Sequence, residues 1–146
     1  MPGFNFEMTL PSDSRKLFEL VTDYESYKQI FPDQLKEVSV VSRNGSDVIT
    51  KEVLTLNTYF KNTELYQKTS HNAQYPILSS DVIEGPFKGT AIQVTFDELD
   101  GGSKVTVNAE LKIGLKYKLL SPIIKNKYKN ILTALLYKMN NIAMNA

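Results

Sequence analysis

The C-terminal part of the chain has the pattern of one long amphipathic helix, and this segment limits the folds that the sequence can adopt. Ser121 is expected to cap the helix and Pro122 to lie in its first turn, where a missing N–H costs little. A helix from Ser121 to about Asn145 would be about 37 Å long, whereas an eight-residue strand spans about 27 Å. Such a helix can lie along a whole sheet. Apolar residues recur along it at steps of three and four: Leu120, Ile124, Tyr128, Ile131, Leu135, Met139 and Ile142, widened by Ile123, Leu132, Leu136 and Ala143.

Most of the chain before this helix has the two-residue period of β-strands. The alternation is clearest on either side of the turn Asp100–Ser103, and Asn44-Gly45 is typical of a tight hairpin. Six strands are expected here: from Leu35 to the turn Arg43–Ser46, Val48–Leu56, Tyr59–Ser70, Tyr75–Ile83, 90–97 and 105–113.

The first 31 residues are expected to form a strand and two helices. Gly3–Leu10 alternates apolar and polar residues, and Ser12 is expected to cap a helix whose apolar residues continue to Tyr24. A second, short helix is expected over about Glu25–Phe31. The order β-α-α-β6-α predicts an α+β fold, in which a curved antiparallel sheet of about seven strands wraps around the C-terminal helix. Because a bent sheet cannot close completely over a straight helix, we expect a cavity between them.

Composition narrows the function classes. The 146 residues suit one domain over 1–146, and the absence of cysteine excludes disulfides, thiolate zinc sites and cysteine nucleophiles. No run of about 18 apolar residues and no signal peptide is present, so we expect a soluble, cytoplasmic protein. With one histidine and no cysteine, we expect no metal site and no cofactor.

Catalytic signatures are also absent. His71 is the only histidine, and the segment Ser70–Gln74 around it reads as a solvated turn. There is no Gly-x-Ser-x-Gly nucleophile elbow, and Gly85–Gly89 does not have the pattern of a phosphate-binding loop. We therefore predict no catalytic residue and expect a binding protein rather than an enzyme.

Two segments carry a resemblance to a known family. The first is Leu17–Tyr27 (LFELVTDYESY) followed by Phe31-Pro32, and the second is Val82–Lys88 (VIEGPFK). Together with the order of elements, they resemble the START-like helix-grip superfamily, which includes Bet v 1-type allergens. The likeness is greatest to the polyketide cyclase/coenzyme Q-binding START subgroup, which also contains the bacterial ribosome-association toxin. Lys28 departs from that subgroup, which often has a proline after the tyrosine.

The resemblance implies a protein that binds or carries a hydrophobic small molecule, such as a lipid, an isoprenoid or a quinone. Two alternatives stay open, because one superfamily hosts several functions. The first is an enzyme of the polyketide cyclase/aromatase kind, which would need a titratable group deep in the cavity. The second is a toxin-like module that contacts the ribosome.

The predicted ligand-binding residues come from the aromatic residues, from two aliphatic residues of the strand expected over 90–97, and from one face of the C-terminal helix. Tyrosines would suit an amphipathic ligand, because buried hydroxyls need hydrogen-bond partners, and methionine adapts to varied ligand shapes. For any one of these residues the alternative is an ordinary core position. The predicted set is Tyr27, Phe31, Phe60, Tyr66, Tyr75, Phe87, Ile92, Val94, Phe96, Tyr128, Leu132, Leu135, Leu136 and Met139.

Charge is unevenly distributed along the chain. Residues 1–110 hold ten basic and sixteen acidic residues, whereas the last 36 residues hold seven lysines and no acidic residue. This pattern favours an anionic partner, either a membrane surface or the ribosome, although a merely solvated face is the alternative. No DNA partner is expected, and the oligomeric state stays open. The predicted anion-binding surface is Lys116, Lys118, Lys125, Lys127 and Lys129.

Overall fold

The structure is a computed structural model that describes residues 3–30, 35–57 and 62–145. Within these residues, seven strands form one antiparallel sheet in the order β1-β7-β6-β5-β4-β3-β2. The strands are β1 (Gly3–Leu10), β2 (Leu35–Asn44), β3 (Asp47–Asn57), β4 (Asn62–Gln74), β5 (Ile77–Glu84), β6 (Ala91–Leu99) and β7 (Gly102–Glu110). The helices are α1 (Ser14–Val21), α2 (Tyr27–Ile30) and α3 (Ser121–Met144), with 3-10 turns η1 (Tyr24–Ser26) and η2 (Leu115–Leu120).

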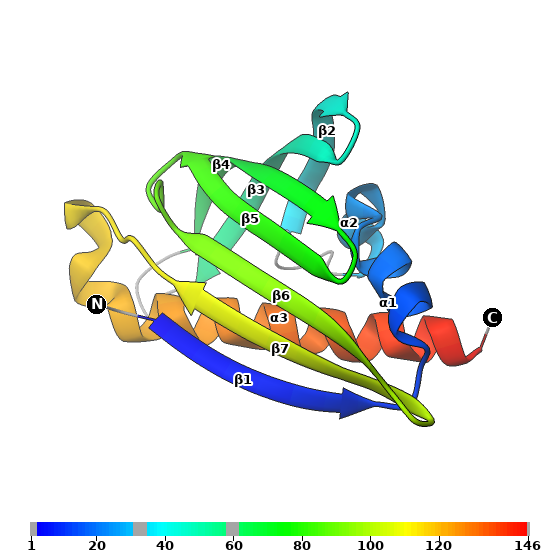
Figure 1. The fold of residues 1–146 in the computed structure, drawn as a ribbon. Helices are drawn as coiled ribbons and strands as arrows, with labels where there is room; N and C mark the ends of the chain where they lie inside the picture. Colours follow the sequence, from blue (N-terminus) through cyan, green and yellow to red (C-terminus); the bar gives the residue numbers. More distant parts are fainter. Residues whose placement is uncertain (1–2, 31–34, 58–61, 146) are drawn as a thin grey trace.

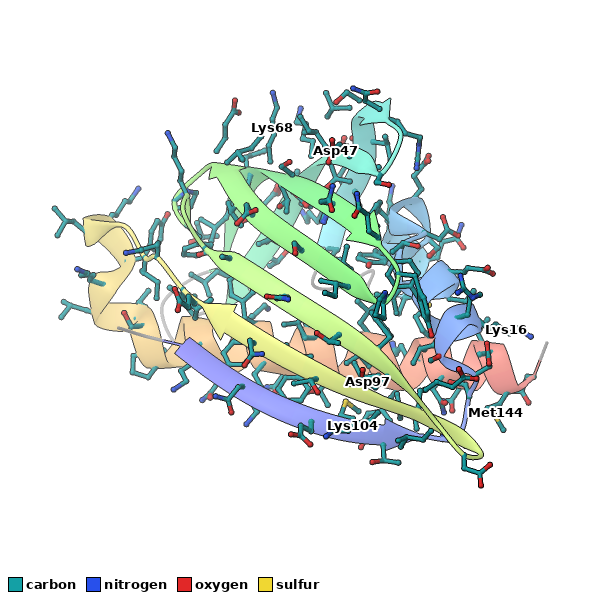
Figure 2. The ribbon with its side chains drawn as sticks, viewed as in Figure 1. Lys16, Asp47, Lys68, Asp97, Lys104 and Met144 are labelled. Carbon is teal, nitrogen blue, oxygen red and sulfur yellow. The ribbon has the colours of Figure 1, made fainter. Side chains whose placement is uncertain are left out.

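The sheet curves around α3, which runs along its concave side (Figure 1). This arrangement confirms the predicted α+β helix-grip fold and its order of elements. Strands β1, β6 and β7 alternate inward apolar residues with outward polar ones, which is the pattern of a sheet with one solvated face. Figure 2 shows Lys68 on the outer side of the sheet, pointing away from α3.

The long helix α3 forms because its buried side is apolar along most of its length. Ile124, Leu136 and Met139 are almost completely buried on it. Ser121 is not the N-cap, contrary to the sequence prediction, because η2 runs directly into the helix and makes Leu120 the cap residue. The Ser121 hydroxyl instead donates to the carbonyl of Lys118 at 2.6 Å.

Helix α1 is capped by Asp13 and not by Ser12 as predicted. The Asp13 carboxylate accepts a hydrogen bond from the Lys16 N–H at 3.0 Å. Ser12 is buried, where its N–H donates to Asn140 Oδ1 at 3.2 Å and its carbonyl accepts from Ser103 Oγ at 2.8 Å. Ser12 therefore ties the end of β1 to α3 and β7.

Among the described residues, the core consists of two apolar clusters. In the larger one, Phe18 of α1 packs edge-on against Phe96 of β6, with ring centroids 5.4 Å apart. The smaller one gathers near the start of α3 around Phe87, Leu111 and Ile124. Residues of both clusters line the cavity described below. No helix in the described ranges is long and apolar enough to cross a bilayer.

Candidate ligand cavity

A cavity of about 150 Å³ lies between α3 and the strands β2 to β7. Apolar cavities of about this volume bind benzene-sized ligands in other proteins. Its polar lining residues are Tyr27, Glu52, Thr55, Gln67, Thr69, His71, Ser80, Lys127 and Tyr128. The apolar lining comprises Val21, Leu35, Val38, Leu54, Leu56, Leu65, Leu78, Val82, Phe87, Ile92, Val94, Val107, Ile124, Ile131, Leu132, Leu135 and Leu136.

A strip of six polar side chains crosses three strands at the floor of the cavity, and all of them except Thr50 line it. Inward-facing positions are two residues apart along each strand, so Thr50 and Glu52 of β3 face inward together. The register places Thr50 opposite Thr69 and Glu52 opposite Gln67 on β4, and His71 opposite Ser80 on β5. An apolar cavity with a few convergent polar groups is the usual form of a small-molecule site. The polar strip is Thr50, Glu52, Gln67, Thr69, His71 and Ser80.

A chain of hydrogen bonds runs through this strip from Ser80 to Glu52. Ser80 Oγ lies 2.7 Å from His71 Nδ1, and His71 Nε2 lies 2.9 Å from Thr50 Oγ1. The Thr50 hydroxyl donates to Glu52 Oε1 at 2.7 Å. Because its single proton is used there, Thr50 must accept from His71, which therefore carries its proton on Nε2. Nδ1 is then the acceptor for the Ser80 hydroxyl.

His71 is a buried member of β4, so the predicted solvated turn at Ser70–Gln74 is wrong. The residues of that segment favour turns in isolation, but pairing with β3 and β5 holds them in a strand. Burial lowers the pKa of His71 to about 4. The imidazole is therefore neutral near pH 7, which agrees with its role as one donor and one acceptor.

Glu52 is one of the lining residues that the sequence analysis missed. Its side chain is 9% exposed, and burial raises its pKa to about 7, while hydrogen bonds from Thr50 and Thr69 oppose the rise. Its second oxygen, Oε2, has no hydrogen-bond partner within the described part of the chain. A sequence signal did exist, because Glu52 interrupts the inward-facing series that begins at Val48 and ends at Leu56.

Two tyrosine hydroxyls lie near this carboxyl group, and both are already paired. Tyr128 donates to Gln67 Oε1 at 3.4 Å, and Tyr27 donates to the carbonyl of Val21. Burial raises the pKa of each tyrosine well above its usual value, with the Glu52 charge adding to the rise. Both phenols therefore stay neutral at any physiological pH.

The cavity brings together eight of the predicted ligand-binding residues. Their role in binding stays a prediction, but their side chains share one apolar space. Phe31 and Phe60, which were also predicted, lie outside the described residues. The eight are Tyr27, Phe87, Ile92, Val94, Tyr128, Leu132, Leu135 and Leu136.

Four predicted ligand residues do not line the cavity. Tyr66 is 60% exposed, because its neighbour Gln67 takes the inward position and alternation turns Tyr66 to the outer face. Phe96 and Met139 are buried in the larger core cluster. Tyr75 lies at the end of the sheet beside α1, where the guanidinium of Arg15 lies 4.1 Å from its ring centroid.

The five lysines of the predicted anion-binding surface do not all lie on one surface in the structure. Lys127 lines the cavity, and burial lowers its pKa. Lys116 and Lys118 are exposed on η2, and Lys129 is exposed on α3 while Lys125 is half-buried there. A second, surface hollow beside η2 is lined by Gly85, Pro86, Lys88, Leu111, Lys112, Ile113, Gly114 and Lys118. In the ranges that the structure describes, no three histidine, aspartate or glutamate side chains gather where they could hold a metal ion.

The chain is similar to several known proteins. It is 27% identical over 141 residues to the ribosome association toxin RatA of Rickettsia prowazekii (strain Madrid E), covering 95% of this chain and 91% of that protein. The structure of TTHA0849 from Thermus thermophilus matches with a TM-score of 0.77 at 16% identity, covering 99% and 98% of the two chains. The Zhui aromatase/cyclase from Streptomyces sp. R1128 matches with a TM-score of 0.75 at 11% identity, covering 94% and 92%.

A family model gives the assignment. The model described as polyketide cyclase/dehydrase and lipid transport matches residues 10–139, which agrees with the resemblance of the segments Leu17–Tyr27 and Val82–Lys88. The structural matches agree with it in fold. The chain therefore belongs to the polyketide cyclase/dehydrase and lipid transport family, whose helix-grip fold it shares.

Proposed function

We propose that the protein binds and carries a hydrophobic small molecule, such as a lipid, an isoprenoid or a quinone-like compound, in the cavity between α3 and the sheet. The observation that carries this proposal is the cavity itself, whose walls are mostly aliphatic and aromatic side chains. Each methylene group that leaves water for such a space contributes about 0.8 kcal/mol. The description of the family, which includes lipid transport, supports the same function.

Native mass spectrometry tests this proposal. Protein purified without detergent is expected to carry a small molecule, and delipidated protein is expected to bind one ligand per chain from a panel of lipids, isoprenoids and quinones. Leu132→Phe should weaken binding at least tenfold, because the larger side chain of this half-buried lining residue would occupy the cavity. Leu20→Phe is the matched control, since Leu20 packs against the core on α1 outside the cavity. Blank spectra with the whole panel would contradict the proposal.

An enzyme of the aromatase/cyclase kind is the second candidate. The observation that favours it is the titratable carboxyl group of Glu52 in the cavity, with a pKa of about 7. A buried group that titrates near neutral pH suits general acid–base chemistry. Conversion of a linear polyketide-like thioester, followed by product mass spectrometry, tests this candidate. Glu52→Gln should then abolish turnover and leave substrate binding in place.

Ribosome association is favoured by one comparison, the likeness to the toxin RatA across nearly the whole chain. The lysines that follow Glu110 would suit ribosomal RNA. Co-sedimentation with ribosomal subunits in a sucrose gradient tests this candidate. Loss of the protein from the ribosomal fractions when Lys125 and Lys129 are changed to glutamine would support it.

A further inference from the structure

The carboxyl group of Glu52 has one satisfied oxygen and one unsatisfied oxygen. Oε1 accepts from Thr50 at 2.7 Å, and Thr69 also donates to the carboxylate, yet the buried Oε2 has no hydrogen-bond partner among the described residues. Leaving a buried carboxyl oxygen unpaired is costly. The two nearby tyrosine hydroxyls do not supply the missing donor, because Tyr27 and Tyr128 donate to Val21 and Gln67.

We propose that the ligand carries a hydroxyl group that donates a hydrogen bond to Glu52 Oε2, an inference that rests on the proposed function above. A hydroxyl suits this position because it donates to an ionised carboxylate and accepts from a protonated one. A carboxylate group on the ligand does not suit it, since two like charges in an apolar cavity repel each other. The ion pairs found within the described ranges do not include Glu52.

Matched eight-carbon probes test this inference. Binding of 1-octanol and of octanoate is measured by isothermal titration calorimetry at pH 8.5, where Glu52 is mostly ionised. The wild-type protein should bind 1-octanol at least tenfold more tightly than octanoate, because a hydrogen bond to a charged group contributes about that much. Glu52→Gln should weaken 1-octanol and strengthen octanoate, whereas a structural role alone would move both affinities in the same direction.

The outcomes separate this inference from the proposed function. Equal binding of the two probes, or octanoate binding that does not respond to Glu52→Gln, would overturn the hydroxyl inference and leave the hydrophobic carrier intact. In the second case the carboxylate would lie at Lys127, the cation in the cavity lining. Binding of neither probe, together with blank native mass spectra, would overturn both.

A second inference comes from the surface around η2. Leu115 and Leu119 are 89% and 97% exposed, which leaves two large apolar side chains almost entirely in water. Figure 1 shows this turn (yellow to orange, between β7 and α3) projecting beyond the sheet at the end of the molecule opposite the C-terminus. The hollow beside it is lined by Lys88, Lys112 and Lys118. We call these five residues the η2 surface.

The geometry points to an anionic lipid bilayer as the partner of the η2 surface. Lysines attract the phosphate groups of lipid headgroups, and the exposed leucines lower their free energy by entering the acyl region. RNA would use the lysines but would offer nothing to the leucines. The surface also adjoins the cavity, because Tyr117 of η2 packs against Phe87, with ring centroids 6.1 Å apart, and Phe87 lines the cavity. Docking would place the bilayer beside that end of the cavity.

Vesicle sedimentation tests this docking. The wild-type protein should sediment with vesicles of phosphatidylcholine and phosphatidylserine (about 7:3) but not with pure phosphatidylcholine, and high salt should weaken the binding. The double variant Leu115→Ser/Leu119→Ser should bind at least tenfold more weakly, and Lys118→Gln should bind severalfold more weakly. Leu99→Ser is the control, because Leu99 is 41% exposed at the distant β6–β7 hairpin.

Three results would overturn the bilayer as partner. The first is the absence of binding to the anionic vesicles. The second is binding to ribosomal subunits that requires the lysines but tolerates the loss of both leucines. The third is a dimer in analytical ultracentrifugation that the double variant converts to a monomer, since the leucines would then be covered by a second copy. Circular dichroism checks that each variant is folded.

Discussion

The imidazole ring of His71 stacks on the phenol ring of Tyr24, with centroids 4.2 Å apart and planes inclined by 17°. Tyr24 begins η1, whereas His71 belongs to β4, so this contact joins the N-terminal helical segment to the polar strip of the cavity floor. Burial raises the pKa of Tyr24 to about 12. The stacked pair is therefore neutral, and its orientation is set by packing and not by charge.

Tyr24→Phe is expected to stabilise the protein by about 1 kcal/mol. The Tyr24 hydroxyl is buried without a hydrogen-bond partner in the part of the chain that the structure describes, so removing it relieves a desolvation cost. The ring and its stacking on His71 remain. Urea denaturation at pH 7 measures the change, and a loss of more than about 1 kcal/mol would mean that the hydroxyl has a partner.

Glu52→Gln is expected to change how stability depends on pH. The folded pKa of Glu52 is about 7 and its unfolded value about 4.5. The folded state therefore holds a proton more tightly, and the wild-type protein loses stability as the pH rises from about 4.5 through 7. Linkage over this shift amounts to about 3 kcal/mol. Glutamine does not titrate, so the variant does not lose stability in this way. Between pH 4.5 and 8, the free energy of unfolding of the variant relative to wild type should therefore rise by about 3 kcal/mol.

Thermal or urea denaturation of both proteins across this range measures the difference. The titration of His71, whose folded pKa of about 4 lies below its unfolded value, costs stability as the pH falls below about 6.5. This contribution of His71 to the pH dependence is present in both proteins, so to first order it cancels in the difference between their free energies of unfolding. A stability difference that is independent of pH would show that Glu52 is ionised with a normal pKa.

Thr50→Val is expected to raise the pKa of Glu52 above about 7. The Thr50 hydroxyl donates to the carboxylate and stabilises its charged form, and valine has the same shape without the donor. Carbon-13 NMR titration of the Glu52 carboxyl carbon measures the shift. Thr69→Val should act in the same direction, whereas Thr106→Val on β7, outside the cavity lining, should leave the titration unchanged.

Gly85→Ala is expected to destabilise the protein by about 3 kcal/mol. Gly85 has φ +115°, and an added Cβ would lie 2.7 Å from the carbonyl oxygen of Tyr66 and 2.9 Å from Gln67 Cβ. Gly101→Ala is the matched control, because φ is +83° there but nothing lies within 4 Å of the added atom. It should cost about 1 kcal/mol. Equal losses for the two variants would show that backbone conformation alone matters at Gly85.

The sequence was sufficient to predict the helices and strands that bury one continuous apolar face. The stripe on α3 and the alternation of β6 and β7 could be read directly, since their partners are apolar as well. The bounds were less accurate: the strand expected over 105–113 ends at Glu110 in the structure. Helix caps were wrong at Ser12 and Ser121, because each depends on contacts with other elements that local patterns do not contain.

The polar strip could not be predicted because it reverses the usual alternation. On β4 the inward positions are Gln67, Thr69 and His71, whereas the aromatic Tyr66 faces outward. A prediction that places apolar residues on the inner face of the sheet therefore assigns Tyr66 to the cavity and His71 to a solvated turn. Recognising Glu52 as part of the site needs the register of β3 against β4, which only the folded sheet supplies.

The neighbouring positions of β1 and β7 have a consequence for how the chain folds. Gly3 pairs with Glu110, so the first strand finds its partner only after most of the chain has been synthesised. Until then Phe4, Phe6 and Met8 remain without the cluster against which they pack. Pairings between such distant residues slow folding. The nascent chain would therefore expose an aggregation-prone apolar strand at its N-terminus. The yield of folded protein in the cell would then depend on chaperones that bind this strand.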